Sequence, residues 1–275
     1  MVGEVVAAVL GSSLVLFADA GHMLTDVAAL AMSAWAVRLA TRPVRGPWTY
    51  GFKRAEILSA AANGVTLVAI AVLIAVEAMQ RIIVPKHVLG GLVLGVALVG
   101  SVINIFATWV LAKANRKSLN VRGAYAHILT DLYAFIGTAI AGLVIVLTGW
   151  DRADPIASLL VVSLMARTAW GLLRDAGKIL LQAAPDDLDL GEVRAHLLDV
   201  PHVLDVHDLH AWTVTSGSPT LAAHVVVEEH CFDTGHAPQI LDTLQACLAE
   251  HFEITHATFQ LEPAHHAGHE EDVHP

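Results

Sequence analysis

Charged residues are scarce in this sequence, and basic ones are almost absent from its last third. Only 15% of the 275 residues are charged and 55% are hydrophobic, whereas soluble domains carry roughly 25% charged residues. From Pro185 onward a single base, Arg194, stands against 17 Asp and Glu, while the preceding part holds 15 bases and 9 acids. This distribution predicts a membrane portion followed by an acidic domain. It argues against nucleic-acid binding, which requires basic patches.

Cysteine and enzyme motifs are scarce as well. The two cysteines, Cys231 and Cys247, both lie in the acidic part, so no disulfide framework is implied and a reducing compartment is expected. No H-E-x-x-H metalloprotease motif is present, and GLLRDAGKI from Gly171 has the wrong glycine spacing for a phosphate-binding loop and lacks its Ser or Thr. We therefore expect neither an enzyme nor a nucleotide cofactor.

Long apolar runs dominate the first two thirds of the chain. A helix needs about 20 apolar residues to cross a bilayer, and five runs reach that length, at 14–37, 55–80, 88–112, 123–148 and 154–174. Residues 1–10 are apolar but only half as long, and we interpret them as the end of a sixth crossing whose beginning is absent. Residues 1–184 are thus predicted to form a six-helix bundle with a truncated first helix.

Basic residues give the expected orientation. They cluster after the 14–37 and 88–112 runs and again at the end of the last run, while the alternate loops hold few. Because Lys and Arg concentrate in cytoplasmic loops, we expect a multi-pass protein of a bacterial inner membrane with everything after Pro185 in the cytosol.

The acidic part has a different periodicity. Residues 185–263 contain a short amphipathic helix capped by Asp186, Asp187 or Asp189, two strands joined by SGSP, a second helix and a last strand. The order αββαβ predicts an α/β ferredoxin-like domain without its first strand. Residues 264–275 are His-rich, have no apolar pattern and are expected to be disordered.

Two matching polar cassettes interrupt the apolar runs. AGHMLTDVAAL places His22 and Asp26 four residues apart, and AHILTDLYAF does the same for His127 and Asp131. Residues at this spacing share one helix face, and ionisable groups within a membrane usually line a functional cavity. The cassettes fall on the second and fifth crossings, which run antiparallel. Polar interruptions at corresponding positions of two three-helix halves are typical of inverted-repeat transporters. The alternative is that the similarity of the six residues arose by chance.

The cassettes carry the donor set of a metal site. If the two faces meet, they bring two imidazole nitrogens and two carboxylates together, which suits tetrahedral Zn²⁺ better than Ca²⁺, Mg²⁺ or Cu(I). The Asp26 and Asp131 carboxylates are then expected roughly 3 to 5 Å apart. The alternative is that each His–Asp pair bonds only within its own helix. Asp19, one turn nearer the outer face, is a candidate to line an exit path, and Gly91 with Gly95 predicts helix packing.

Four motifs together identify a family. ADAGHMLTD, WTYGFKRAE, SLNVRGAYAHILTD and HDLHAWTVTSG resemble the zinc-type branch of the cation diffusion facilitators over nearly all of residues 1–262. The resemblance implies a homodimer that exchanges cytosolic Zn²⁺ for protons, with His22, Asp26, His127 and Asp131 as the transport site. Loop residues 41–54 contain no His or Asp, so the additional loop site of some members is not expected.

The resemblance also implies a regulatory zinc site at His207, His224 and Glu262, although satisfied polar residues are the plain alternative. His207 and His210, three apart on a strand, are expected on opposite faces. His230, Cys231 and His236 are a candidate further site, for which an ordinary surface loop is the favoured interpretation.

The predicted function is a proton-coupled antiporter that exports Zn²⁺, or Cd²⁺ or Co²⁺, through the His/Asp site. Proton exchange follows from the ligands, which must lose protons to bind metal, and from imidazole, whose charge changes near neutral pH. Its partners are the metal, protons, membrane lipid and a second copy of the chain. The alternatives are a membrane metal sensor that transports nothing and, disfavoured by the absence of a nucleophile near the cassettes, a membrane enzyme.

Overall fold

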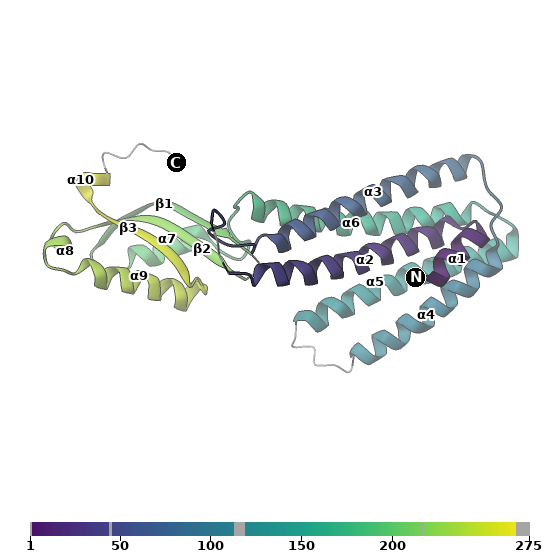
Figure 1. Cartoon of the computed structure of the whole chain (residues 1–275), viewed down its shortest axis with the longest axis horizontal. Helices are drawn as coiled ribbons and strands as arrows, with labels where there is room; N and C mark the ends of the chain where they lie inside the picture. Colours follow the sequence, from purple (N-terminus) through teal and green to yellow (C-terminus); the bar gives the residue numbers. More distant parts are fainter. Residues whose placement is uncertain (1, 44–45, 113–118, 216, 268–275) are drawn as a thin grey trace. The chain divides into compact units, whose positions relative to one another are not determined.

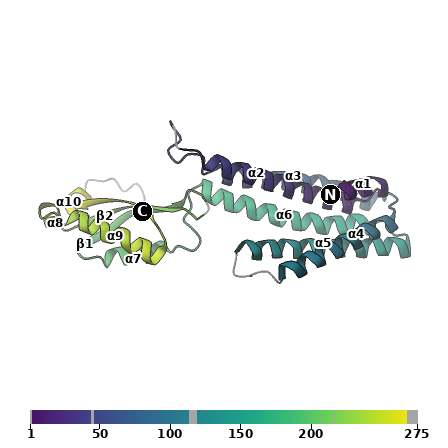
Figure 2. The ribbon, with the colours of Figure 1, turned by 60° about the horizontal axis from the view of Figure 1, so that its bottom comes forward.

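The computed structural model describes residues 2–43, 46–112, 119–215 and 217–267. The chain divides into two compact units, Met1–Ala34 with Ser59–Leu173, and Trp35–Leu58 with Arg174–Pro275. The first unit is a helical bundle and the second contains a three-stranded sheet (Figures 1 and 2). The predicted class, a helical membrane bundle followed by an α/β domain, is confirmed.

Six helices make up the membrane portion, and each predicted apolar run forms one of them. They are α1 (Val2–Gly11), α2 (Leu14–Ala40), α3 (Ala55–Ile83), α4 (Gly90–Ala112), α5 (Leu119–Thr148) and α6 (Ala153–Leu180). Among the described residues, four segments are long and apolar enough to cross a membrane, at 55–83, 90–110, 131–148 and 153–180. Only 28% to 33% of each is buried within the chain. The remaining apolar surface is of the kind that lipid covers.

The break between α1 and α2 is stabilised by a carboxylate that is distant in the sequence. Asp154, in the first turn of α6 and fully buried, accepts a hydrogen bond from the backbone N–H of Leu14 at 2.7 Å and another from the Ser13 hydroxyl. The Leu14 N–H is among the backbone donors that the first turn of α2 leaves without intrahelical acceptors. Because α2 begins where α5 has ended and α6 begins, α2 and α5 run antiparallel, as Figure 1 shows.

Glycines bring α4 and α5 into close contact. A Cβ atom at Gly142 would lie 2.7 Å from the backbone nitrogen of Leu94, and one at Gly100 would lie 2.3 Å from the ring of Phe135. A Cβ at Gly91 or Gly95 would meet nothing within 4 Å among the described residues. Gly91 and Gly95 therefore pack against none of the described residues, because their face of α4 is turned away from the neighbouring helices, and the helix packing that they predict stays a prediction.

The second unit contains the predicted αββαβ order. Its elements are α7 (Leu190–Leu198), β1 (Val203–Thr213), β2 (Pro219–Val227), α8 (His230–Asp233), α9 (Ala237–Phe252), β3 (His256–Pro263) and α10 (Ala264–Ala267). Of the three predicted caps, Asp189 is the one used: its carboxylate accepts from the N–H groups of Gly191 and Glu192. The expected disordered tail begins with the single turn of α10, and its residues 268–275 lie outside the described part of the chain.

The sheet order explains why the domain is an incomplete ferredoxin-like fold. The strands lie in the order β1-β2-β3, with β1 and β2 antiparallel and β2 and β3 parallel. A complete fold of this type places another strand between the two parallel ones. The described residues form no such strand, so β2 and β3 pair directly and α9 forms the crossover between them. Apolar residues of α7 and α9 pack on one face of the sheet, which leaves the other face for polar residues.

Candidate metal centres

The two cassettes meet through His22. Its Nε2 atom lies 3.8 Å from a carboxylate oxygen of Asp26, one turn further along α2, and 3.8 Å from a carboxylate oxygen of Asp131 on α5. The three side chains are 14%, 29% and 24% exposed, respectively. The hydroxyl of Thr25, the threonine of this cassette, donates a hydrogen bond to the His22 carbonyl at 2.6 Å. Its polar group is therefore satisfied within the helix.

The spacing is close to that of a metal shell. Two ligand atoms about 2.0 to 2.1 Å from a tetrahedral Zn²⁺ lie about 3.4 Å apart, within half an ångström of the distances from His22 to the two carboxylates. His127 lies on α5 one turn before Asp131, but its side chain is outside the part that the structure describes. The structure therefore brings together three of the four predicted ligands and the helix that carries the fourth.

Asp19 lies on the same face of α2 as His22 and Asp26, at spacings of three and seven residues. It is only 5% exposed, and its Oδ2 atom has no hydrogen-bond partner among the described residues. Its carboxylate is close enough to interact electrostatically with Glu4, Asp131 and Asp26. This part of the bundle therefore gathers four acidic side chains, Glu4, Asp19, Asp26 and Asp131.

The cytosolic candidates form a second cluster. His207 on β1 and His224 on β2 are directly paired across the strands, and their ring centroids lie 5.2 Å apart. Glu262 on β3 is 2% exposed, and its two oxygens lie 2.6 Å from His207 Nε2 and 3.7 Å from His224 Nδ1. The ligand atoms of all three lie within 4.8 Å of one another. A buried carboxylate between two imidazoles is a suitable donor set for Zn²⁺.

A β-bulge overturns one expectation about this sheet. A regular strand would place His207 and His210 on opposite faces, but β1 pairs His207 with His224 and His210 with Ala222. Between these two pairs, two residues of β1, Asp208 and Leu209, therefore lie opposite the single residue Ala223 of β2, and Asp208 adopts a positive φ of 49°. His207 and His210 consequently share a face. The prediction of opposite faces is wrong because a bulge shifts the alternation by one residue.

The candidate set His230, Cys231 and His236 is not brought together as a unit. His236 Nδ1 lies 2.7 Å from the Thr234 hydroxyl, and the cluster around His230 and Cys231 is instead completed by His202 and Glu228. Burial raises the pKa of the Cys231 and Cys247 thiols. Among the tail histidines, His265 lies 3.8 Å from Glu229, while His269 and His274 lie outside the described residues.

Sequence reasoning missed two kinds of residue at these sites. Gln260 donates to the second oxygen of Glu262 at 3.2 Å and so helps to orient it. The period-two alternation of β3 puts these two residues on one face and was a usable signal. His202 and Glu228 flank the β1–β2 hairpin, and only the strand register brings them together.

The fold and the sites define a class: a multi-pass membrane protein with polar, metal-type side chains within its bundle and a cytoplasmic domain. The cation efflux transmembrane domain matches residues 1–181, and the cytoplasmic domain of cation efflux proteins matches residues 185–264. The chain therefore belongs to the cation efflux, or cation diffusion facilitator, family. It is a membrane transporter of metal cations and not an enzyme.

Relatives of established identity extend along nearly the whole chain. The zinc transporter ZitB of Escherichia coli is 42% identical over 96% of this chain and 84% of its own length. The metal cation efflux system protein CzcD of Cupriavidus metallidurans is 38% identical over 96% and 83%. The cadmium, cobalt and zinc/H(+)-K(+) antiporter of Bacillus subtilis is 34% identical over 97% and 86%. The resemblance to the zinc-type branch is confirmed.

Proposed function

We propose that the chain exports Zn²⁺ from the cytosol in exchange for protons, through a site formed by His22, Asp26, His127 and Asp131. The observation that carries this proposal is the position of His22, whose imidazole reaches a carboxylate on its own helix and another on α5. Ionisable side chains within a membrane bundle are energetically costly, and their presence there usually indicates a function. The names of the relatives ZitB and CzcD support metal efflux, and the Bacillus antiporter supports exchange against protons.

Each ligand has a role in this proposal. Asp26 and Asp131 neutralise the charge of the divalent ion, and His22 and His127 provide nitrogen donors that favour Zn²⁺ over harder cations. Cd²⁺ and Co²⁺ tolerate the same shell and are candidate substrates as well. Asp19 provides a further carboxyl group along α2, towards the outer end of the bundle.

Proton exchange follows from the same ligands. Metal binding requires neutral imidazole and ionised carboxylate, so the site cannot hold Zn²⁺ and its protons together. A proton gradient directed inward loads the site with protons from outside and releases the metal there. Zinc arriving from the cytosol then displaces the protons, and no nucleotide is required.

The cytosolic cluster is proposed as a regulatory site. Zinc bound by His207, His224 and Glu262 would link β1, β2 and β3, because each strand provides one ligand. We further propose that the protein is a homodimer, as the family's cytoplasmic domain suggests. In this proposal residues 1–184 form the transport domain, residues 185–263 the cytoplasmic domain and residues 264–275 a His-rich tail.

The test is metal flux in proteoliposomes under an imposed pH gradient, with Zn²⁺, Cd²⁺, Co²⁺ and Mn²⁺ compared. Zn²⁺ transport should accelerate when the gradient drives protons against it. Asp131→Asn should slow the initial rate by at least tenfold, since even groups that only support metal ligands cost about 10- to 100-fold.

Asp175→Asn is the matched control, because Asp175 is an exposed carboxylate on α6 and is no part of the site. Its rate should equal that of the unmodified chain. Transport that ignores the pH gradient would contradict proton coupling, and an Asp131→Asn variant with an undiminished rate would contradict the site.

A further inference from the structure

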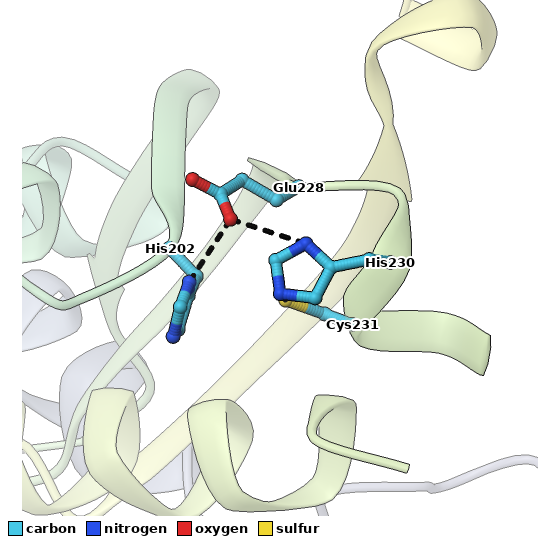
Figure 3. A group of neighbouring side chains, drawn as sticks. All are labelled: His202, Glu228, His230 and Cys231. Carbon is cyan, nitrogen blue, oxygen red and sulfur yellow. Dashed lines mark hydrogen bonds and ion pairs between the residues drawn. The ribbon is translucent and has the colours of Figure 1, made fainter. Parts of the chain in front are cut away.

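A third cluster of metal-type side chains lies at one end of the β1–β2 hairpin (Figure 3). It consists of His202, which precedes β1, Glu228, which follows β2, and His230 and Cys231, which open α8. One ligand atom of each residue lies within 4.8 Å of those of the others. The cluster is separate from the three-residue site: His202 is five residues before His207 along the chain, about 16 Å at the rise of an extended strand.

The side chains converge on a single carboxylate oxygen. Glu228 Oε2 lies 3.0 Å from His202 Nδ1 and 3.2 Å from His230 Nδ1, and Figure 3 shows both imidazoles turned towards it. The two rings lie edge to face with centroids 5.3 Å apart. The Cys231 sulfur lies behind His230, 3.9 Å from its Nε2.

The backbone holds these residues in place. The N–H of Glu228 donates to the His202 carbonyl at 3.1 Å, and the N–H of Cys231 donates to the Glu228 carbonyl at 3.0 Å. His202 has a φ of 72°, a left-handed conformation that is unfavourable for a residue with a Cβ atom. A strained histidine at the mouth of a donor cluster is the kind of outlier that accompanies a functional constraint.

Burial divides the cluster into a closed base and an open mouth. Cys231 is fully buried, whereas the side chains of His202, Glu228 and His230 are 42%, 41% and 54% exposed. An ion can therefore arrive from solvent through the polar side chains and meet the sulfur at the bottom.

We propose that His202, Glu228, His230 and Cys231 form an additional site in the cytoplasmic domain for a borderline-soft divalent cation, Zn²⁺ or Cd²⁺. Two imidazoles, one carboxylate and one thiolate complete a tetrahedral shell. The sulfur makes this shell softer than either the membrane site or the His207–His224–Glu262 cluster, neither of which contains cysteine. The proposal does not depend on transport and stands or falls independently of it.

Cobalt is the probe, because a thiolate bound to Co²⁺ gives a near-ultraviolet charge-transfer band that oxygen and nitrogen ligands do not give. The chain has only two cysteines, so in the full-length protein in detergent the band isolates this site from every other. The unmodified chain should show one thiolate–cobalt band. Cys247→Ser, the matched control, should retain it and Cys231→Ser should lose it. Added Zn²⁺ or Cd²⁺ should abolish the cobalt band by displacement.

Because Cys231 is buried, its replacement could abolish the band by destabilising the domain. Substitutions of two exposed ligands therefore provide a second test. Each of His202→Asn and Glu228→Gln should weaken cobalt binding, followed by the same band, at least tenfold. Asparagine tolerates the left-handed backbone, and Asp233→Asn, an exposed carboxylate of α8, should leave the affinity unchanged. The proposal is overturned by no band at saturating Co²⁺, by a band that depends on Cys247, or by unchanged affinity in both ligand variants.

Discussion

His22 occupies the position on which the membrane site depends. Its imidazole reaches both an acid of its own helix and an acid of α5, and only 14% of its side chain is exposed. Its nitrogen is borderline in hardness, whereas the carboxylates around it are hard donors. We therefore expect the imidazoles to decide which metal is bound and the carboxylates to neutralise its positive charge.

Replacing histidine by aspartate tests this division directly. In His22→Asp, His127→Asp or the double variant, a hard oxygen replaces nitrogen, so the ratio of Zn²⁺ to Mn²⁺ flux should fall. Because aspartate titrates with an ordinary pKa near 3.9 and histidine near 6.5, the pH dependence of transport should move to lower pH. The measurement is the flux ratio in proteoliposomes as a function of pH. An unchanged ratio and profile in the double variant would show that the histidines are not ligands.

At the scale of elements, the start of α2 is the connection on which the cassette geometry depends. The start of α2 is capped by the local Ser13, whose hydroxyl accepts from the Leu16 N–H at 3.3 Å, and by Asp154, which is completely buried and lies 140 positions away from Leu14. A second contact joins the same end of the bundle, since Arg81 at the end of α3 donates to the Ser12 carbonyl at 2.6 Å. These contacts fix where α2 begins and therefore where His22 and Asp26 lie.

Removing the cap should destabilise the bundle. Asp154→Ala leaves the Ser13 hydroxyl and the Leu14 N–H buried without their acceptor, which costs roughly 1 to 3 kcal/mol for each such loss. We expect a net loss of about 2 kcal/mol, comparable with the largest measured cap effects. Thermal unfolding in detergent provides the readout, with Asp175→Ala as an exposed control. Equal melting temperatures for the two variants would contradict the role of Asp154.

At the scale of the molecule, both the membrane bundle and the cytoplasmic domain carry clusters of metal-type donors, and the clusters of the two domains differ in their ligands. The membrane cluster contains nitrogen and oxygen donors within a bundle, while the cytoplasmic clusters lie on a sheet and at its hairpin end. A transporter needs a site that opens alternately to two sides. We propose that the cytoplasmic clusters sense metal and do not move it.

This division predicts that the membrane site and the His207–His224–Glu262 cluster contribute unequally to transport. The triple variant His207→Ala, His224→Ala, Glu262→Ala should keep part of its Zn²⁺ flux, whereas Asp131→Ala should lose nearly all of it. Zinc should also protect the cytoplasmic domain against unfolding in the unmodified chain, by about 2.7 kcal/mol at a hundredfold excess over the dissociation constant, and less so in the triple variant. Equal and complete loss of flux in both variants would instead make the cytoplasmic cluster essential.

Local patterns in the sequence determined the elements and the chemical nature of the membrane site. Apolar runs of sufficient length predicted α2 to α6 because a bilayer fixes the length of a crossing. The i, i+4 spacing placed His22 with Asp26 because helix periodicity is a short-range property. The αββαβ order and the Asp189 cap were predictable for the same reason.

Only the tertiary structure decided which distant residues meet. The cap of α2 by Asp154, the close approach of α4 and α5 at Gly100 and Gly142, and the pairing of His202 with Glu228 all join residues far apart in the sequence. The bulge at Asp208 reversed a prediction that a regular strand required. Periodicity specifies which face a residue occupies, but contacts between elements depend on packing and strand register, which a one-residue shift changes completely.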